Sequence, residues 1–151
     1  MRTFQTLSEL TALVGQQVAV SDWITITQEQ VKQFAQATGD HQWIHVDVER
    51  ARAGPFGAPI AHGFLTLSLI PQFFHAALEI REVGMGVNYG LNKVRFMAPV
   101  PVGSRLRARM KLLAAEPIDN AGLQMAWEVT VLREGSEKPV CVAESLVRRY
   151  P

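Results

Sequence analysis

The chain has 151 residues, of which 48% are hydrophobic and 19% are charged, and its formal net charge is +1. This length and composition are typical of one globular domain, which we expect to span residues 1–151 and to bury about 70% of the surface of its unfolded chain. The near-neutral charge gives no reason to expect binding to nucleic acid or to an anionic membrane. The longest apolar stretch, residues 63–78, is too polar and too short to predict a membrane span.

Cys141 is the only cysteine, so no internal disulfide can form. A chain without disulfides is typical of a reducing compartment, and the first five residues lack the apolar core of a signal peptide. We therefore expect a cytoplasmic protein. Cys141 falls within a predicted strand, which favours an inert core residue over a reactive thiol.

The chain begins with weak local patterns. Residues 5–15 have a helical pattern that stops at a glycine, which predicts a short helix. Residues 18–26 are rich enough in β-branched and aromatic side chains for a strand. We expect Val18 and Val20 to face inward in this strand.

A clearer helix follows. Thr27 and Gln30 fit a capping box, and Gly39 marks the end of the apolar stripe that comes after it. Residues 40–60 contain no long periodic run, although Asp47 is placed to cap a helix of one turn. A loop of this length inside a compact domain is usually functional or else disordered.

Residues 63–80 have a helical pattern that is apolar nearly all round. Because a surface helix would show a polar face, this central helix should be buried on most sides. Pro71 removes one backbone donor, which predicts a kink or a break near the middle of the helix.

The remainder of the chain alternates between apolar and polar residues with period two. Strands are predicted at about 87–96, 102–112, 123–131 and 140–149, with a turn at residues 134–136. Consecutive strands joined by short turns favour an antiparallel sheet with one covered face. The expected architecture is an α+β fold in which this sheet wraps around the central helix.

Two motifs carry the chemistry. Residues 38–47 place Asp40 and His45 five residues apart, just after a helix end, and residues 58–65 lead directly into the central helix at Gly63. A carboxylate, an imidazole and a helix amino terminus can together activate water and stabilise an oxyanion.

These motifs, in this order and about a dozen residues apart, resemble the signature of the MaoC-like dehydratases. That family includes the (R)-specific enoyl-CoA hydratases, and a branch named for nodulation protein N is similar. The resemblance covers essentially the whole chain and implies a hot-dog fold. It also implies an acyl-CoA or acyl carrier protein thioester as substrate, and a homodimer with the acyl tunnel near the subunit boundary. The exposed edge expected for a single sheet favours a dimer as well.

The resemblance assigns Asp40 and His45 as the catalytic pair and places the Gly63 amide at the thioester oxygen. The substrate-binding set implied by the motif positions is completed by Gln42, Ala61 and His62. Two departures stand out. The family often has Asn-Pro where this chain has Gln42-Trp43, which keeps an amide but adds bulk. Pro71 stands where some members carry a serine that assists the acid.

Simpler interpretations of the same residues exist. Asp40 can be a turn residue after Gly39, and His45 a half-buried structural histidine, although the flanking motif favours catalysis. His62 is better explained by a hydrogen bond to the backbone that shapes its loop than by direct catalysis. Asp47 is best explained as a helix N-cap.

No metal or cofactor pattern emerges. His45 and Asp47 form a His-x-Asp pair, but the other nearby imidazoles, His41 and His62, give no metal-ligand spacing. Residues 84–86 do not continue into a dinucleotide fingerprint. We expect neither a metal nor a cofactor, apart from the coenzyme A of a thioester substrate.

One predicted strand carries a row of basic residues, namely Arg105, Arg107, Arg109 and Lys111. Such a row is usually a solvated face of a sheet. The functional alternative is that one or two of these residues, or Lys93 and Arg95, steer the phosphates of coenzyme A.

Three functions follow from these observations. The leading hypothesis is an (R)-specific enoyl-CoA hydratase in which His45 is the base and Asp40 orients the water. The second is a hot-dog thioesterase with Asp40 as base or nucleophile. The third is a non-catalytic acyl-thioester-binding or signalling subunit, which the nodulation branch suggests and the intact Asp40/His45 pair opposes.

Overall fold

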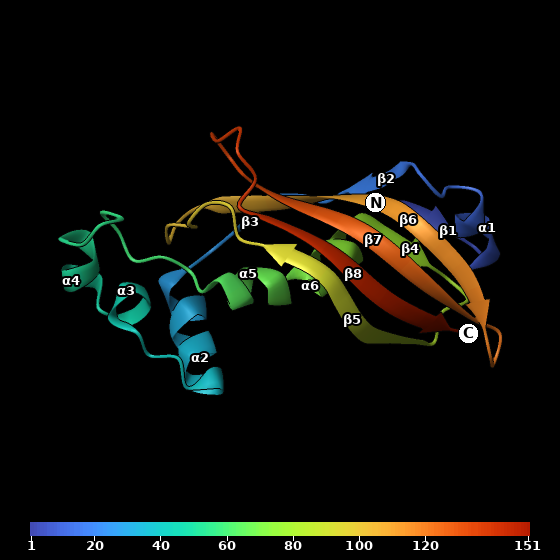
Figure 1. Ribbon diagram of the computed structural model, residues 1–151, viewed down its shortest axis with the longest axis horizontal. Coiled ribbons are helices and arrows are strands. Elements are labelled where there is room, and N and C mark those ends of the chain that lie inside the picture. The colour runs from blue at the N-terminus through green and yellow to red at the C-terminus, as the bar shows by residue number, and fades with distance from the viewer.

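The computed structural model describes residues 1–151 and has the predicted α+β composition. In chain order the elements are β1 (Arg2–Phe4), α1 (Ser8–Thr11), β2 (Gln17–Val20), β3 (Ile24–Thr25), α2 (Gln28–Thr38), α3 (Trp43–Val46), α4 (Val48–Arg52), α5 (Gly63–Ser68), α6 (Ile70–Ala77), β4 (Leu78–Ile80), β5 (Met85–Arg95), β6 (Arg105–Ile118), β7 (Gly122–Arg133) and β8 (Cys141–Tyr150). In Figure 1 the long strands curve over α5 and α6, and α2, α3 and α4 form a lobe at one end.

The main sheet is antiparallel, as predicted. Its strands lie in the order β2-β6-β7-β8-β5, and β3 also pairs with β6. In β6 the predicted alternation is confirmed, because Leu106, Ala108, Met110 and Leu112 are fully buried while most of the basic row is exposed. The inward side chains of β6, β7 and β8 supply much of a core of 28 buried residues.

The predicted break in the central helix is confirmed, but its predicted end is wrong. The helix divides into α5 and α6 at Leu69, and Pro71 lies in the first turn of α6, where its missing N–H costs no helical hydrogen bond. Residues 78–80 form β4 rather than helix, and they pair in parallel with β1. A short apolar run fits helix or strand equally well from sequence alone. Here the pairing with β1, from the beginning of the chain, makes residues 78–80 a strand.

The prediction that the central helix is buried on most sides is wrong for the single chain. One face packs on the sheet: Phe73 is fully buried and the ring of Phe74 meets that of Trp127 at 5.1 Å between centroids. The other face is open, since Phe64 is 67% exposed and Gln72 is also exposed. The apolar run therefore has two faces, of which the chain itself covers one.

The predicted strand at residues 18–26 divides into β2 and β3, and the inward direction expected for Val20 is wrong. A register shift in the pairing of β2 with β6 leaves Val18 and Ala19 both buried, whereas Val20 is 42% exposed. Two neighbouring residues facing the same side are the mark of a β-bulge. Strict alternation cannot anticipate such a bulge.

The signals for helix ends are confirmed. The Thr27 hydroxyl accepts from the Gln30 N–H at 3.1 Å, and Gly39 ends α2 with a φ of 80°, which a glycine adopts without strain. Asp47 caps α4 by accepting from the Arg50 N–H at 3.1 Å. The one-turn helix α3, within the predicted loop, was missed.

None of the helices has the length and apolar content that a membrane crossing requires.

Candidate active site

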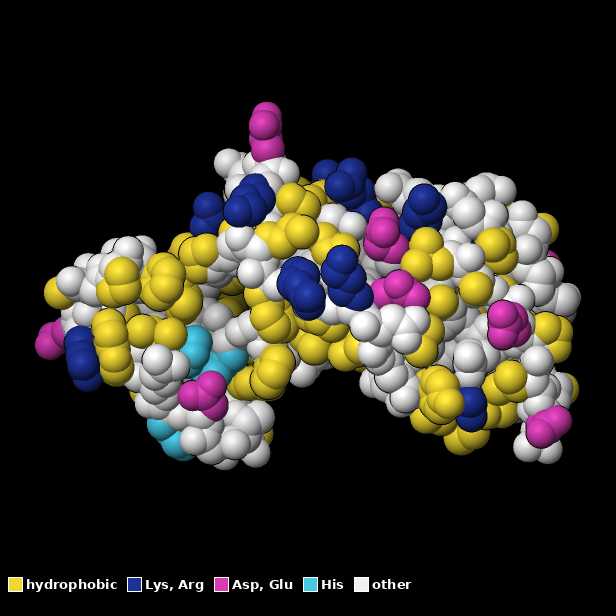
Figure 2. Space-filling view, viewed as in Figure 1, with side chains coloured by type: hydrophobic (Ala, Val, Ile, Leu, Met, Phe, Trp, Pro, Cys, Tyr) yellow, Lys and Arg dark blue, Asp and Glu magenta, His cyan; other side chains and the backbone are white.

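The two sequence motifs meet at the amino end of α5. Asp40 comes directly after the C-cap of α2, His45 lies in α3, and His62 and Gly63 begin α5. Figure 2 shows histidine side chains beside an acidic one in the hollow between the helical lobe and the sheet. The structure therefore brings together the predicted catalytic pair and the predicted helix terminus.

Each histidine is held by a carbonyl group of the other motif. The Nδ1 atom of His45 lies 2.7 Å from the Ile60 carbonyl oxygen, and the Nε2 atom of His62 lies 2.9 Å from the Asp40 carbonyl oxygen. Because a carbonyl oxygen only accepts, both of these nitrogens donate a proton. In the neutral rings the lone pairs are therefore on Nε2 of His45 and Nδ1 of His62.

The two imidazoles are stacked and buried. Their centroids lie 3.8 Å apart with an interplanar angle of 24°, and His45 and His62 are 6% and 3% exposed. The Nδ1 atom of His62 is buried without a hydrogen-bond partner. The predicted backbone hydrogen bond of His62 is present, and His62 also supports the ring of His45.

Burial lowers the pKa of His45. Loss of hydration is the largest cause, because it disfavours the charged ring; the hydrogen bond to Ile60 raises the pKa, the charge of His62 lowers it and the Asp40 carboxylate raises it. The net shift is downward from 6.5. His45 is therefore neutral near pH 7 and can act as a base through Nε2.

Asp40, His45 and His62 bring potential metal-ligand atoms within 4.8 Å of one another. The stacked rings fit a metal poorly, however. In nearly parallel rings the lone pairs run side by side, whereas a tetrahedral zinc site needs them to converge on one point. The arrangement suits a shared water or proton better, and the expectation of no metal site stays a prediction.

Two hollows meet at the site. One, of about 430 Å³, has a polar side made by Thr38, Asp40, His45 and His62. The other, of about 320 Å³, is mainly apolar, and Ala61 is in its wall. His45, Gly63 and Phe96 border both hollows. A polar and an apolar compartment thus share one imidazole and one helix terminus.

The amino end of α5 offers unpaired backbone donors. The N–H groups of its third and fourth residues both donate to the His62 carbonyl, which leaves those of Gly63 and Phe64 without a protein acceptor. A Cβ atom at Gly63 would lie 3.0 Å from the ring of Phe96. A side chain here would press on Phe96, which packs directly on the backbone.

The residues between Asp40 and His45 lie at the edge of the site. Gln42 is exposed, and its N–H donates to the Asp40 carboxylate at 3.3 Å. Its predicted role toward substrate stays a prediction. Trp43 turns away from the hollows: its ring packs on Gly54 and lies 4.2 Å beneath the guanidinium of Arg50. Its bulk is thus accommodated by α4 rather than by the pocket.

Sequence reasoning missed Thr66. This residue lies one helical turn after Gly63, is 2% exposed, borders the apolar hollow and has a buried hydroxyl without a hydrogen-bond partner. An unsatisfied buried hydroxyl is unusual in a folded protein. A polar residue three positions after the glycine in an apolar run was the signal that could have revealed it.

Two simpler interpretations fit the geometry. Arg105 forms an ion pair with Glu134 at 3.0 Å, and Arg107 lies 4.5 Å from the ring of Trp23, so these members of the basic row have structural partners. Cys141 is fully buried, and burial raises its pKa to about 11. A thiol in this environment is protonated and unreactive.

The sequence matches the family model described as "MaoC like domain" over residues 9–132. The chain belongs to the MaoC-like dehydratase family. It is 58% identical to 3-hydroxyacyl-thioester dehydratase Z of Mycobacterium tuberculosis over 148 residues, which cover 98% of both chains. It is 46% identical to Nodulation protein N of Rhizobium leguminosarum bv. viciae, over 91% of this chain and 86% of that one.

The structure of R-Hydratase PhaJ1 from Pseudomonas aeruginosa is similar, with a TM-score of 0.69 and 26% identity, over 91% of this chain and 81% of that one. The predicted hot-dog fold and family are thus confirmed. This MaoC-like dehydratase is an enzyme of the hydro-lyase class.

The environment of His45 predicts opposite effects of its two charged neighbours. In NMR titrations the imidazole should titrate below 6.5. Asp40→Asn should lower the pKa further, whereas His62→Phe, which keeps an aromatic ring in the stack, should raise it. Since the unfolded chain binds this proton more tightly, the free energy of unfolding should fall as the pH drops below 6.5. Shifts in the same direction in both variants would contradict this account.

Proposed function

We propose that this MaoC-like dehydratase is an (R)-specific enoyl-CoA hydratase that adds water to trans-2-enoyl thioesters and, in reverse, dehydrates 3-hydroxyacyl thioesters. The observation that carries the proposal is the meeting of Asp40, His45 and the free Gly63 amide at one hollow. The similarity to 3-hydroxyacyl-thioester dehydratase Z and to R-Hydratase PhaJ1 supports it.

The proposed reaction adds the oxygen of water to C3 of the enoyl thioester and a proton to C2. Nε2 of His45 takes a proton from water while the water oxygen forms a bond to C3, and the pair of electrons of the double bond moves toward the thioester carbonyl. The Gly63 N–H holds the resulting enolate oxygen, a contribution of about 3 kcal/mol for a well-placed donor. A proton returned through Asp40 and His45 then adds to C2. The His45 hydrogen bond to Ile60 fixes the tautomer that this sequence requires.

The competing enzymatic function is thioester hydrolysis with Asp40 as base or nucleophile. The Asp40 carboxylate is exposed and accepts a hydrogen bond from the Gln42 N–H. A spectrophotometric assay with crotonyl-CoA separates the two reactions. Loss of enoyl absorbance without release of thiol indicates hydration, and chiral analysis of the product gives its configuration. Binding of acyl-CoA without any turnover would favour a non-catalytic function.

We also propose a homodimer formed through β5. This strand pairs only with β8 and is the last in the sheet, and its apolar residues Met85, Val87, Tyr89 and Leu91 are 42–53% exposed. A long apolar edge strand left uncovered promotes aggregation. A second β5, antiparallel to the first, would continue the sheet and cover the open face of α5 and α6.

We extend the proposal to the carrier of the acyl substrate and to the cellular location of the protein. Lys93 and Arg95 are exposed on β5 and line a hollow with Met97, Glu128 and Glu144. Because Met97 also borders the apolar hollow of the site, we propose that these two cations meet the phosphates of coenzyme A or of an acyl carrier protein. The buried, protonated Cys141 is consistent with the cytoplasmic location expected from the sequence.

Replacing either member of the catalytic pair should abolish most of the activity. Asp40→Asn and His45→Gln should each lower kcat for crotonyl-CoA hydration by about 10²–10⁴-fold, the usual contribution of general acid–base catalysis. Circular dichroism and the unfolding midpoint serve as controls for an intact fold. Near-wild-type hydration by either variant would remove this mechanism.

Thr66 should contribute to catalysis at the expense of stability. Thr66→Val keeps the shape but removes an unsatisfied hydroxyl, so the free energy of unfolding should stay the same or rise by about 1 kcal/mol. If the hydroxyl binds the substrate or the water, kcat should fall about tenfold. Thr66→Ser should restore most of the rate. A valine variant of full activity would leave the hydroxyl without a function.

Charges on β5 should separate the proposed dimer. The double variant Tyr89→Glu/Leu91→Glu should sediment as a monomer, because burying two carboxylates against a copy of themselves is unfavourable. Arg109→Glu, an exposed position on β6, is the matched control and should stay dimeric. A wild-type monomer with full activity at assay concentration would refute the dimer.

A further inference from the structure

β8 carries a cation on its core-facing side. Its buried residues recur at every second position from Cys141 to Val147, and Arg149 continues that series. Arg149 lies opposite Gly86 in the pairing of β8 with β5, and a Cβ atom at Gly86 would overlap its guanidinium group. The guanidinium therefore lies over β5, in space that exists because residue 86 has no side chain.

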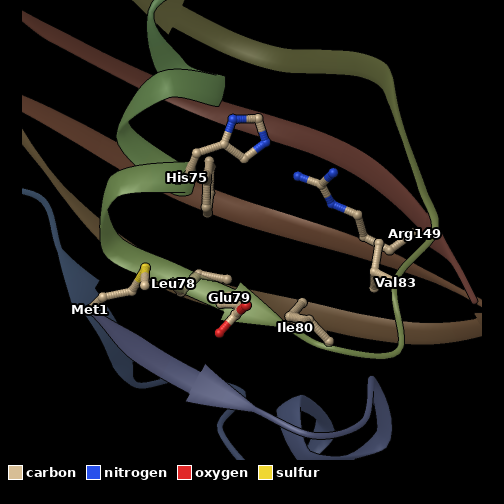
Figure 3. A pocket seen from close by; sticks show the side chains of 8 residues that line it. Met1, His75, Leu78, Glu79, Ile80, Val83 and Arg149 are labelled. Carbon is tan, nitrogen blue, oxygen red and sulfur yellow. The ribbon is translucent and has the colours of Figure 1, made fainter.

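This guanidinium borders a cavity and has no acidic partner. The cavity has a volume of about 330 Å³, and its apolar walls are Phe74, Leu78, Ile80 and Val83. Figure 3 shows Arg149 and His75 directed toward each other across it, while Glu79 points away. Glu79 instead lies 3.9 Å from Arg81, and Arg149 forms no ion pair.

Burial lowers the pKa of Arg149, because desolvation disfavours its charge, but a guanidinium stays protonated in proteins. Arg149 is half-buried, and a partly desolvated cation gains from an anionic partner. No acidic side chain of the same chain pairs with it, so an anion from outside the chain can occupy this place. A planar guanidinium favours two oxygens of a carboxylate or a phosphate.

The proposed dimer places Arg149 of one copy near the catalytic site of the other. We place the two-fold axis of this dimer near Gly90, the midpoint of β5, so that residue 86 of one copy lies beside residue 94 of the other. Phe96, two residues further on, packs against Gly63 at the catalytic site. Neighbouring strands lie about 4.8 Å apart, and both Arg149 and the catalytic site are on the helix side of the sheet.

We propose that Arg149 of one copy completes the active site of the other copy by binding an anionic group of the thioester substrate. The inference rests on the proposed hydratase function and on the β5 dimer. It assigns the cavity at the end of α6 to the second copy's site, so each active site takes its acid, base and oxyanion donor from one chain and its cation from the other.

Complementation tests this arrangement. Arg149→Gln homodimers should lose about tenfold or more in kcat/KM for crotonyl-CoA, as expected for loss of a charge-assisted hydrogen bond. Asp40→Asn homodimers should be inactive. In a heterodimer purified through two different tags, the Arg149→Gln chain keeps its catalytic pair and receives Arg149 from the Asp40→Asn chain. One site of two is then intact, so about half of the wild-type activity should return.

Gly86→Ala provides a second variant. It keeps the positive charge but displaces the guanidinium, and it should lose activity as a homodimer and complement Asp40→Asn in the same way. Arg149→Gln and Gly86→Ala homodimers of full activity would overturn the proposal. Heterodimers with no more activity than the parent homodimers would also overturn it, because Arg149 would then act within its own chain.

Two further measurements identify the anion and isolate the inference from the hydratase proposal. A phosphate of the carrier is indicated if the Arg149→Gln defect disappears with the crotonyl thioester of N-acetylcysteamine. A defect that persists with this thioester, which carries no anionic group, would overturn the proposal. In the inactive Asp40→Asn background, calorimetry should show weaker binding of crotonyl-CoA when Arg149→Gln is added. Equal binding would refute the inference, whereas a wild-type enzyme that binds but never hydrates would refute the hydratase proposal alone.

Discussion

The site depends on a reciprocal pair of hydrogen bonds between two segments. His45, from the loop after α2, donates to the carbonyl of Ile60, and His62, at the start of α5, donates to the carbonyl of Asp40. A third bond, from the Ile60 N–H to the carbonyl of Ile44, joins the same segments at 3.0 Å. Each imidazole thus orders the backbone that carries the other motif. A loop without regular periodicity is thereby fixed against the central helix.

These bonds also set the chemistry. A donor bond from Nδ1 leaves the lone pair of His45 on Nε2, and burial lowers the pKa, so the ring is present as the neutral base. The stacked ring of His62 limits rotation of His45. The polar features at the core of the site then remain available for substrate: an exposed carboxylate, an unpaired backbone donor and the Thr66 hydroxyl. The backbone donor and the Thr66 hydroxyl have no protein partner in the free chain, as a pre-organised site requires.

Local signals in the sequence predicted much of this structure. The Thr27 cap, the Gly39 terminus and the Asp47 cap depend on neighbouring residues and were correct. The four strands after residue 85 were also found, although β6 runs over residues 105–118 rather than the predicted 102–112. The errors came from long-range effects. The strand at residues 78–80 exists because β1 pairs with it, and Val20 faces outward because of a bulge against β6. The hydroxyl of Thr66 could not be identified as unsatisfied before its surroundings were known.

The open face of the central helix is the most informative of these differences. Its apolar pattern predicted burial on most sides, yet the single chain leaves Phe64 and much of β5 exposed. A sequence pattern records the burial of the assembled protein, because apolar positions are maintained wherever water is finally excluded. Under the proposed dimer, the pattern and the exposure agree. The same dimer explains why Arg149 has no ion-pair partner within its own chain. The exposed apolar residues of β5 and the Arg149 guanidinium, which lies over β5, are both at the edge of the sheet where the second copy would bind.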